Sequence, residues 1–195
     1  MPLLGAVRNL DIALFNIINR DCANAIFDTV MPVITSLGSG KAVFIAAIMI
    51  ALIAGRKKKA VSIILLAAIP VAQTFAYHLK MFFALPRPGN VLSEIHLLVH
   101  ANGYAFPSGH TTMICTAATI LAAFFRSRAL FLWLAAAVGV SRIYTGAHFP
   151  SDVLSGALLG TGLGYGMVAF ANYTGFLRLS PESGAVSTMR STTRA

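Results

Sequence analysis

The stretch AVSIILLAAIPVAQTFAYHLKMFF, residues 60–83, decides the fold of this chain. Lys80 is its only residue with a formal charge. A helix of about 20 apolar residues crosses the ~30 Å hydrocarbon layer of a bilayer. The stretch is long enough for one crossing, so it predicts a transmembrane helix.

Four further stretches have the same character. They are residues 36–55, 108–125, 129–146 and 151–173. In the last of them, Gly156, Gly160 and Gly164 recur every four residues, a spacing that lets helix backbones approach closely in lipid. We therefore predict an all-α fold, a polytopic membrane helical bundle with about five transmembrane helices.

The composition excludes several other classes of protein. Of the 195 residues, 57% are hydrophobic and 11% are charged, and the mean hydropathy is +0.76. Soluble domains carry about 25% charged residues, so a water-soluble globule is excluded, as are disordered, collagen-like and disulfide-scaffold chains. The two cysteines, Cys22 and Cys115, indicate neither a disulfide framework nor a metal site.

The net charge is +9, and six of the 15 cations cluster between apolar stretches, which indicates membrane topology rather than nucleic-acid binding. With single crossings, the loops at 56–59 and 126–128 and the tail at 178–195 fall on one side of the membrane. That side carries nine of the 15 Lys and Arg residues, so we expect it to be cytoplasmic. Residues 84–107 and 142–152 would then face the extracytoplasmic side.

The first 35 residues are expected to form helices that lie on the membrane surface. Asp11 and Asn16 interrupt one apolar segment, and the next, residues 24–37, is too short to cross a bilayer alone. An additional span over residues 22–37 is the alternative. The Gly38-Ser39-Gly40 run predicts a hinge into the first crossing. The expected organisation is interfacial helices at 1–35, a membrane domain at 36–177 and a polar, disordered tail at 178–195.

The polar residues of most interest fall in three patches on the extracytoplasmic side. The patches are Lys80 to Pro88, Phe106 to Thr111, and Ser141 to Asp152. Lys80, Arg87 and Arg142 come from distant parts of the sequence, and three converging cations in a poorly solvated site need a multiply charged anion. A phosphate is the obvious candidate. Cations at membrane surfaces are also common topology signals or headgroup contacts, but these three lie on the side that the positive-inside rule disfavours.

The same patches carry groups suited to phosphoryl transfer. Pro107 and Ser108 predict a helix start, whose backbone N–H groups and positive dipole end favour an anion, and His110 lies in its first turn. His148 and Asp152 are four residues apart, so the carboxylate can select the imidazole tautomer that leaves the other nitrogen free to attack. A metal site is an alternative for His78, Glu94, His96 and His100, but no third ligand has a fixed spacing.

Together the patches resemble the signature of the type 2 phosphatidic acid phosphatase (PAP2) superfamily, whose wider relatives include vanadium-dependent haloperoxidases and glucose-6-phosphatase. The pattern Lys-x6-Arg-Pro, Pro-Ser-Gly-His and Ser-Arg-x5-His-x3-Asp is met without a departure. The matching residues are Lys80, Arg87, Pro88, Pro107, Ser108, Gly109, His110, Ser141, Arg142, His148 and Asp152. The resemblance implies a PAP2/haloperoxidase-like helical core in the membrane domain.

The resemblance also implies a role for each residue. His148 would attack phosphorus to form a phosphohistidine, Asp152 would orient it, and His110 would protonate the departing oxygen. The phosphoryl oxygens would be held by Lys80, Arg87, Ser108, Gly109 and Arg142. No metal or other cofactor is implied, because these cations and backbone donors supply the charge neutralisation.

The expected substrate is a phosphate or diphosphate of a membrane lipid, with undecaprenyl diphosphate as the first candidate. Phosphatidylglycerophosphate, phosphatidic acid and lipid A phosphates are the alternatives, since some dedicated undecaprenyl diphosphatases have Asp where this chain has Gly109. A lipid-binding or transport protein is the non-enzymatic alternative. We expect a bacterial cytoplasmic (inner) membrane location, an extracytoplasmic site, and neither a nucleic-acid partner nor an obligate protein partner.

Overall fold

The computed structural model describes residues 2–53 and 56–176, and every regular element in these ranges is helical. The N-terminal part contains α1 (Pro2–Asn16), a π-helical turn η1 (Ile17–Asp21) and α2 (Ala25–Ser36). The bundle contains α3 (Gly40–Ile53), α4 (Arg56–Phe83), α5 (Gly109–Phe124), α6 (Arg128–Tyr144) and α7 (Pro150–Tyr173), with a short 3-10 turn η2 (Pro88–Asn90). The predicted all-α fold is confirmed.

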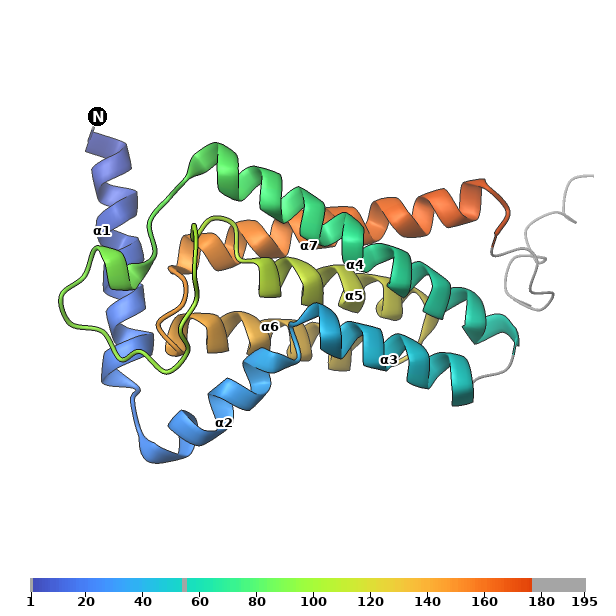
Figure 1. Ribbon diagram of the computed structural model, residues 1–195, viewed down its shortest axis with the longest axis horizontal. Helices are drawn as coiled ribbons and strands as arrows, with labels where there is room; N and C mark the ends of the chain where they lie inside the picture. Colours follow the sequence, from blue (N-terminus) through green and yellow to red (C-terminus); the bar gives the residue numbers. More distant parts are fainter. Residues whose placement is uncertain (1, 54–55, 177–195) are drawn as a thin grey trace, which may run out of the picture.

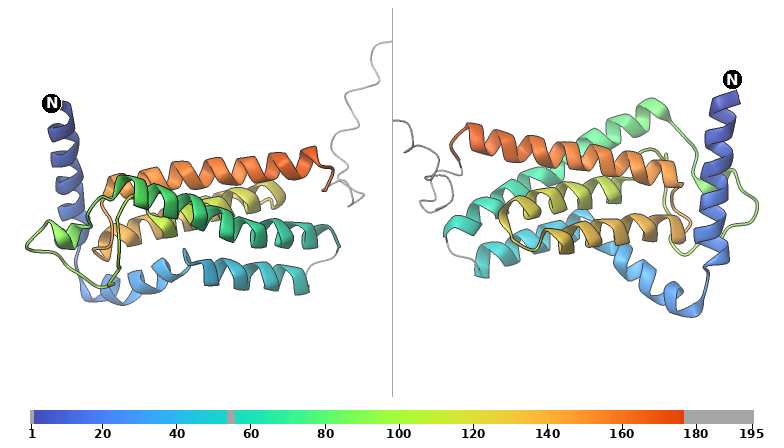
Figure 2. Two further views of the ribbon diagram at one scale, coloured as in Figure 1. Left: turned by 45° about the horizontal axis from the view of Figure 1, so that its top comes forward. Right: turned by 180° about the vertical axis from the view of Figure 1, so that it is seen from behind.

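Helices α3 to α7 run side by side, and α1 crosses one end of this bundle (Figures 1 and 2). Helix α5 is the central element, because it packs against α3, α4, α6 and α7. Its buried threonines need hydrogen bonds in an apolar interior. The Thr112 hydroxyl donates to the carbonyl of Ser108 at 2.9 Å, and the Thr116 hydroxyl donates to the carbonyl of Thr112 at 2.8 Å. A helix with polar side chains can therefore occupy the centre.

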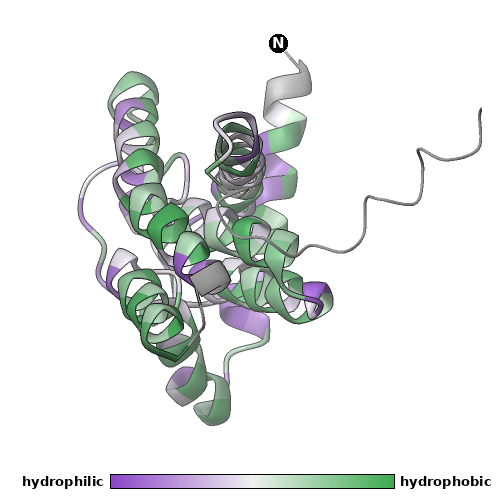
Figure 3. Ribbon diagram, turned by 90° about the vertical axis from the view of Figure 1, so that its right-hand side faces the viewer, coloured by the Kyte–Doolittle hydropathy of each residue, from purple (hydrophilic) through white to green (hydrophobic). Residues whose placement is uncertain are grey.

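The predicted number of five transmembrane helices is not confirmed. Five helices lie close to the predicted stretches. Among residues 2–53 and 56–176, however, only α7 and the segment Lys59–Asn90, which includes most of α4, are each long and apolar enough to cross a membrane. The α2 and α3 pair, bent by 64°, would make a third crossing. With 16 residues, α5 extends only about 24 Å at 1.5 Å per residue. Most of the bundle is nevertheless built from hydrophobic residues (Figure 3), and many large apolar side chains, such as Leu52, Ile53 and Leu158, are exposed.

The glycine stripe of α7 packs against α5, as the spacing predicts. A Cβ atom at Gly156 would lie 2.7 Å from the backbone oxygen of Ser108, and one at Gly164 would lie 2.6 Å from Cβ of Thr119. A Cβ at Gly160 would overlap the backbone oxygen of Thr112. Larger residues would force the two helices apart, so these glycines set the close approach that places the start of α7 beside the start of α5.

In the N-terminal region, α2 is connected to the first helix of the bundle at a sharp bend. Helix α2 begins at the cap Asn24, whose side chain accepts a hydrogen bond from the N–H of Phe27, and it is joined to α3 by the predicted hinge. The 64° bend at this hinge fits either one broken span made of both helices or a re-entrant loop. The alternative of a separate span over residues 22–37 stays a prediction. The predicted tail at 178–195 lies outside the described residues.

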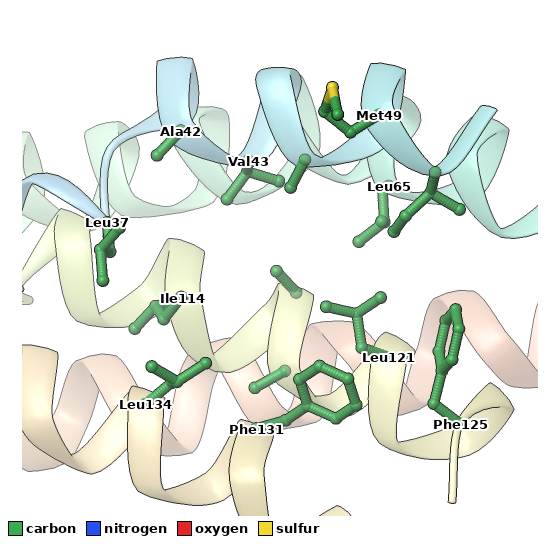
Figure 4. A pocket seen from close by; sticks show the side chains of 14 residues that line it. Leu37, Ala42, Val43, Met49, Leu65, Ile114, Leu121, Phe125, Phe131 and Leu134 are labelled. Carbon is green, nitrogen blue, oxygen red and sulfur yellow. The ribbon is translucent and has the colours of Figure 1, made fainter. Parts of the chain in front are cut away.

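An apolar cavity of about 460 Å³ lies between α3 on one side and α5 and α6 on the other (Figure 4). Leu37 lies at one end of its lining, and Phe125 and Phe131 line it farther along the bundle. The lining is almost entirely hydrocarbon. This part of the bundle therefore offers no polar group for chemistry, and the polar groups gather instead at the end crossed by α1.

Candidate active site

The three sequence patches meet at one end of the bundle. Lys80 lies in the last turn of α4 and donates to the backbone oxygen of Pro107 at 2.7 Å, just before α5 begins. The backbone N–H of Ser108 donates to the backbone oxygen of Asp152 at 2.9 Å, which joins the starts of α5 and α7. These contacts join segments 27 and 44 residues apart in the sequence and hold them together around His148.

His148 is the buried centre of this site, with 2% of its surface exposed. Its Nε2 lies 3.2 Å from Nη1 of Arg87, and its Nδ1 lies 3.5 Å from Oδ2 of Asp152. A guanidinium can only donate, so Nε2 accepts and the ring proton sits on Nδ1, facing the carboxylate. The nitrogen that carries the free electron pair is therefore Nε2.

The charge state of His148 follows from its surroundings. Burial is the largest cause that brings its pKa well below the ordinary value, and the nearby charges of Arg142, Arg87 and Lys80 lower it further. His148 lies in the loop between α6 and α7. At neutral pH its imidazole is uncharged, which is the form that can act as a nucleophile.

Asp152 is held in the first turn of α7 by local hydrogen bonds. Its Oδ2 accepts the backbone N–H of Phe149 at 2.9 Å, and Pro150 occupies the first helical position, where a missing N–H costs nothing. Asp152 as a whole has 3% of its surface exposed. It is thus fixed next to the imidazole before any ligand binds.

Two of the predicted phosphate-binding cations are tied to the loop that precedes α5. The Lys80 ammonium donates to the backbone oxygens of Tyr104 and Ala105, each at 3.0 Å, in addition to Pro107. Arg87 donates to backbone oxygens of Asn102, Gly103, Tyr104 and Ala147 at 2.9 to 3.1 Å. These contacts aim the Arg87 guanidinium at His148 and give the loop its shape.

Arg142, the third cation, is buried in the last turn of α6. Its Nη1 donates to the hydroxyl of Thr35 at 3.0 Å, and its Nε has no hydrogen-bond partner within the described part of the chain. A buried guanidinium nitrogen without an acceptor is costly. This orphaned donor beside His148 fits a site for an anionic oxygen.

The start of α5 supplies the remaining predicted residues. Ser108 is fully buried, and its side-chain oxygen accepts the hydroxyl of Thr111 at 2.9 Å and the N–H of Thr111 at 3.4 Å. Gly109 and His110 line a cavity of about 390 Å³ together with Lys80. All eight predicted site residues therefore lie at the same end of the bundle.

Two positioning residues were missed by the sequence reasoning. Asp11 of α1 accepts the backbone N–H and the hydroxyl of Ser151, and Thr35 of α2 accepts from Arg142. Phe15 of α1 also packs on Phe149, with ring centroids 5.3 Å apart. Asp11 could have been noticed in the sequence, because an acidic residue within an apolar helix needs a polar partner. The sequence could not identify that partner, Ser151, because it lies 140 residues away.

Two of the residues considered as an alternative metal site, Glu94 and His96, have other contacts. Nε2 of His96 lies 2.8 Å from Oδ1 of Asp28, which also accepts the Tyr144 hydroxyl at 2.6 Å. Glu94 forms an exposed ion pair with Arg20. Within residues 2–53 and 56–176, no group of three His, Cys, Asp or Glu residues could hold a metal ion. The contacts of Asp28 with His96 and Tyr144 anchor the 84–107 loop to α2 and α6.

Comparison with known proteins assigns this chain to a family. The model of the PAP2 superfamily matches residues 60–176. The bacitracin transport permease protein BcrC of Bacillus licheniformis is 40% identical over 76 residues, which are 38% of this chain and 37% of that protein. The undecaprenyl-diphosphatase of Sulfolobus acidocaldarius is 29% identical over 173 residues, which are 85% of this chain and 81% of that protein.

A solved structure has the same architecture. The crystal structure of LpxE from Aquifex aeolicus superposes with a TM-score of 0.73 and 33% identity, over 82% of this chain and 95% of that one. Other relatives are named lipid A 1-phosphatase and phosphatidylglycerophosphatase B. The matched region contains all three patches that meet around His148. The chain therefore belongs to the PAP2 superfamily, as one of its membrane-embedded phosphatases.

Proposed function

We propose that this protein hydrolyses a phosphate monoester or diphosphate of a membrane lipid through a phosphohistidine on His148. The observation that carries the proposal is the neutral, buried imidazole with Nε2 at 3.2 Å from Arg87 and Nδ1 turned toward Asp152. Such an imidazole can attack phosphorus without first losing a proton. The cations around it match the charge of the phosphoryl group.

In the first step, Nε2 of His148 forms a bond to phosphorus while the bond from phosphorus to the leaving oxygen breaks. The N–H group of Arg87 that faces Nε2 of His148 donates instead to a phosphoryl oxygen. Asp152 stabilises the positive charge that develops on the imidazole. His110 donates a proton to the departing oxygen. Arg142 and the Ser108 and Gly109 groups hold the phosphoryl oxygens, and Lys80, whose three N–H groups donate to Tyr104, Ala105 and Pro107, adds its positive charge.

In the second step, water attacks the phosphohistidine. His110, now without its proton, takes a proton from the water as the new P–O bond forms and the N–P bond breaks. Inorganic phosphate leaves, and both histidines return to their initial protonation states. These two reaction steps need no metal ion, because cationic side chains of the protein neutralise the charge of the phosphoryl group.

Undecaprenyl diphosphate is our first substrate candidate, and the name of the Sulfolobus relative supports it. The names of other relatives support lipid A phosphates and phosphatidylglycerophosphate as alternatives, and phosphatidic acid completes the set. We propose that the site faces the extracytoplasmic side of a bacterial cytoplasmic membrane, with the C-terminus in the cytoplasm. An amphiphile could then present its headgroup to the site while its tail stays in the bilayer.

The test is phosphate release by the purified protein from undecaprenyl diphosphate, phosphatidylglycerophosphate, phosphatidic acid and lipid A. We expect release from at least one of these lipids, and acid-labile labelling of the protein when the attacked phosphate carries ³²P. The His148→Ala variant should give neither signal. Absence of phosphate release from all four lipids by the wild-type protein would refute the proposal.

A further inference from the structure

Gln73 is an exposed polar side chain within α4, on the segment long and apolar enough to cross the membrane. Within residues 2–53 and 56–176, its amide forms no hydrogen bond to another group. An unpartnered amide at membrane depth is costly, and a polar residue retained there is a candidate for function. Gln73 lies two helical turns before Lys80, about 10 Å along the axis.

The amide of Gln73 faces the hinge that joins α2 to α3. A Cβ atom at Gly40 would lie 2.7 Å from Nε2 of Gln73, so the glycine leaves room for the amide. Gln73 and Gly40 both line the cavity of about 390 Å³ that contains Lys80, Gly109 and His110. The amide and the proposed proton donor therefore open into one space.

The same two residues also line an adjoining recess of about 450 Å³. Its other lining residues are Lys41, Phe44 and Ile45 of α3 and Ile69 of α4. Phe44 and Ile45 are themselves exposed on the outside of α3. The two spaces thus meet at Gly40 and Gln73, and the second one reaches apolar side chains exposed on the outside of α3.

The direction of the proposed reaction decides what occupies these two spaces. The attacking and leaving groups lie in line through phosphorus, so a group that departs toward His110 leaves on the side away from His148. The lipid part of the substrate must then extend into the cavity that His110 lines. This step rests on the proposed function.

We propose that Gln73 donates a hydrogen bond to an oxygen of the departing lipid, a few bonds beyond the leaving oxygen. That oxygen is an ester carbonyl in an acylated lipid, or an oxygen of the second phosphate in a prenyl diphosphate. The hydrocarbon beyond it lies in the recess formed by Phe44, Ile45 and Ile69. Gln73 is thereby a specificity residue that recognises the leaving group and has no part in the attack on phosphorus.

The experiment compares Gln73→Leu with wild type on three substrates in detergent. Dioctanoyl phosphatidic acid offers ester carbonyls, undecaprenyl diphosphate offers a second phosphate, and dodecyl phosphate offers no oxygen beyond the leaving one. We expect Gln73→Leu to raise KM about fivefold for one or both of the first two, which identifies the acceptor, and to leave dodecyl phosphate within about twofold. Thr74→Val, which removes the neighbouring exposed hydroxyl on α4, should change none of them.

An equal loss on all three substrates would overturn the proposal, because it would mean that Gln73 only supports the packing of the hinge. An unchanged KM for all three would overturn it as well. Failure of the proposed function is a separate result. In that case the wild-type protein itself would release no phosphate from any of the three substrates, and Gln73 would lose its assigned ligand with it.

Discussion

The Asp11 carboxylate accepts two hydrogen bonds from Ser151, one from its backbone N–H at 2.8 Å and one from its hydroxyl at 2.7 Å. Ser151 lies in the first turn of α7, immediately before Asp152. A carboxylate at a helix N-terminus satisfies free N–H groups and interacts favourably with the helix dipole. Helix α1 therefore fixes the segment that carries the proposed catalytic carboxylate, from across the end of the bundle (Figure 2).

Removing this cap should weaken catalysis without removing the site. Loss of a helix cap costs about 1 kcal/mol, so we expect Asp11→Ala to lower kcat about fivefold, with little change in KM. Phosphate release at saturating lipid measures the effect. Asp21→Asn, which changes an exposed acid of η1, is the matched control. A kcat for Asp11→Ala equal to that of the control would contradict the positioning role.

Replacement of the proposed nucleophile should have a far larger effect. His148→Ala is expected to lower phosphate release by at least about 10³-fold, because it removes the nitrogen that is proposed to form the bond to phosphorus. His78→Ala, on the exposed side of α4, should keep wild-type activity. Size-exclusion profiles in detergent check that both variants fold. Turnover by His148→Ala near the wild-type rate would remove His148 as nucleophile.

The contact between Thr35 and Arg142 predicts a role for α2 in phosphate binding. Thr35→Val keeps the shape of the side chain but removes the hydroxyl that holds Nη1 of Arg142 at 3.0 Å. We expect kcat/KM to fall about fivefold, since a hydrogen bond to a charged group contributes roughly 1.5–3 kcal/mol and part of that is recovered by repositioning. Thr29→Val, on the exposed side of the same helix, is the control. Equal kcat/KM values for the two variants would argue against this role.

The lowered pKa of His148 predicts the acidic side of the pH profile. Protonation of the imidazole abolishes the nucleophile, and burial brings its pKa well below the ordinary value of 6.5. The neutral form therefore persists as the pH falls through 6.5. After correction for ionisation of the substrate, kcat/KM should not lose half its value until the pH is below 6.5. A midpoint at or above pH 6.5 assigned to His148 would be the contrary result.

The proposed mechanism predicts activity without divalent metal ions. Lys80, Arg87 and Arg142 supply the positive charge that Mg²⁺ supplies in many phosphoryl-transfer enzymes. Phosphate release should be the same, within experimental error, before and after dialysis against EDTA. Restoration of lost activity by added Mg²⁺ would show that these cations do not suffice.

The sequence by itself determined where the helices lie and which polar residues deserve attention. Apolar stretches and caps such as Ser108 act over a few residues, so helix positions followed from local pattern. The glycine spacing in α7 predicted its close packing, and the break before Gly40 predicted the hinge, for the same reason. Each of these features depends on neighbours within one or two helical turns.

Only the tertiary structure decided which distant groups meet. Asp11 reaches Ser151 across 140 residues and Thr35 reaches Arg142 across 107, and no spacing rule links positions so far apart. The number of helices long enough to cross a membrane was also left to the structure, because the folded chain decides where each helix ends, and α5 ends after 16 residues. Long-range contacts depend on how whole helices pack, and that packing is a property of the complete chain.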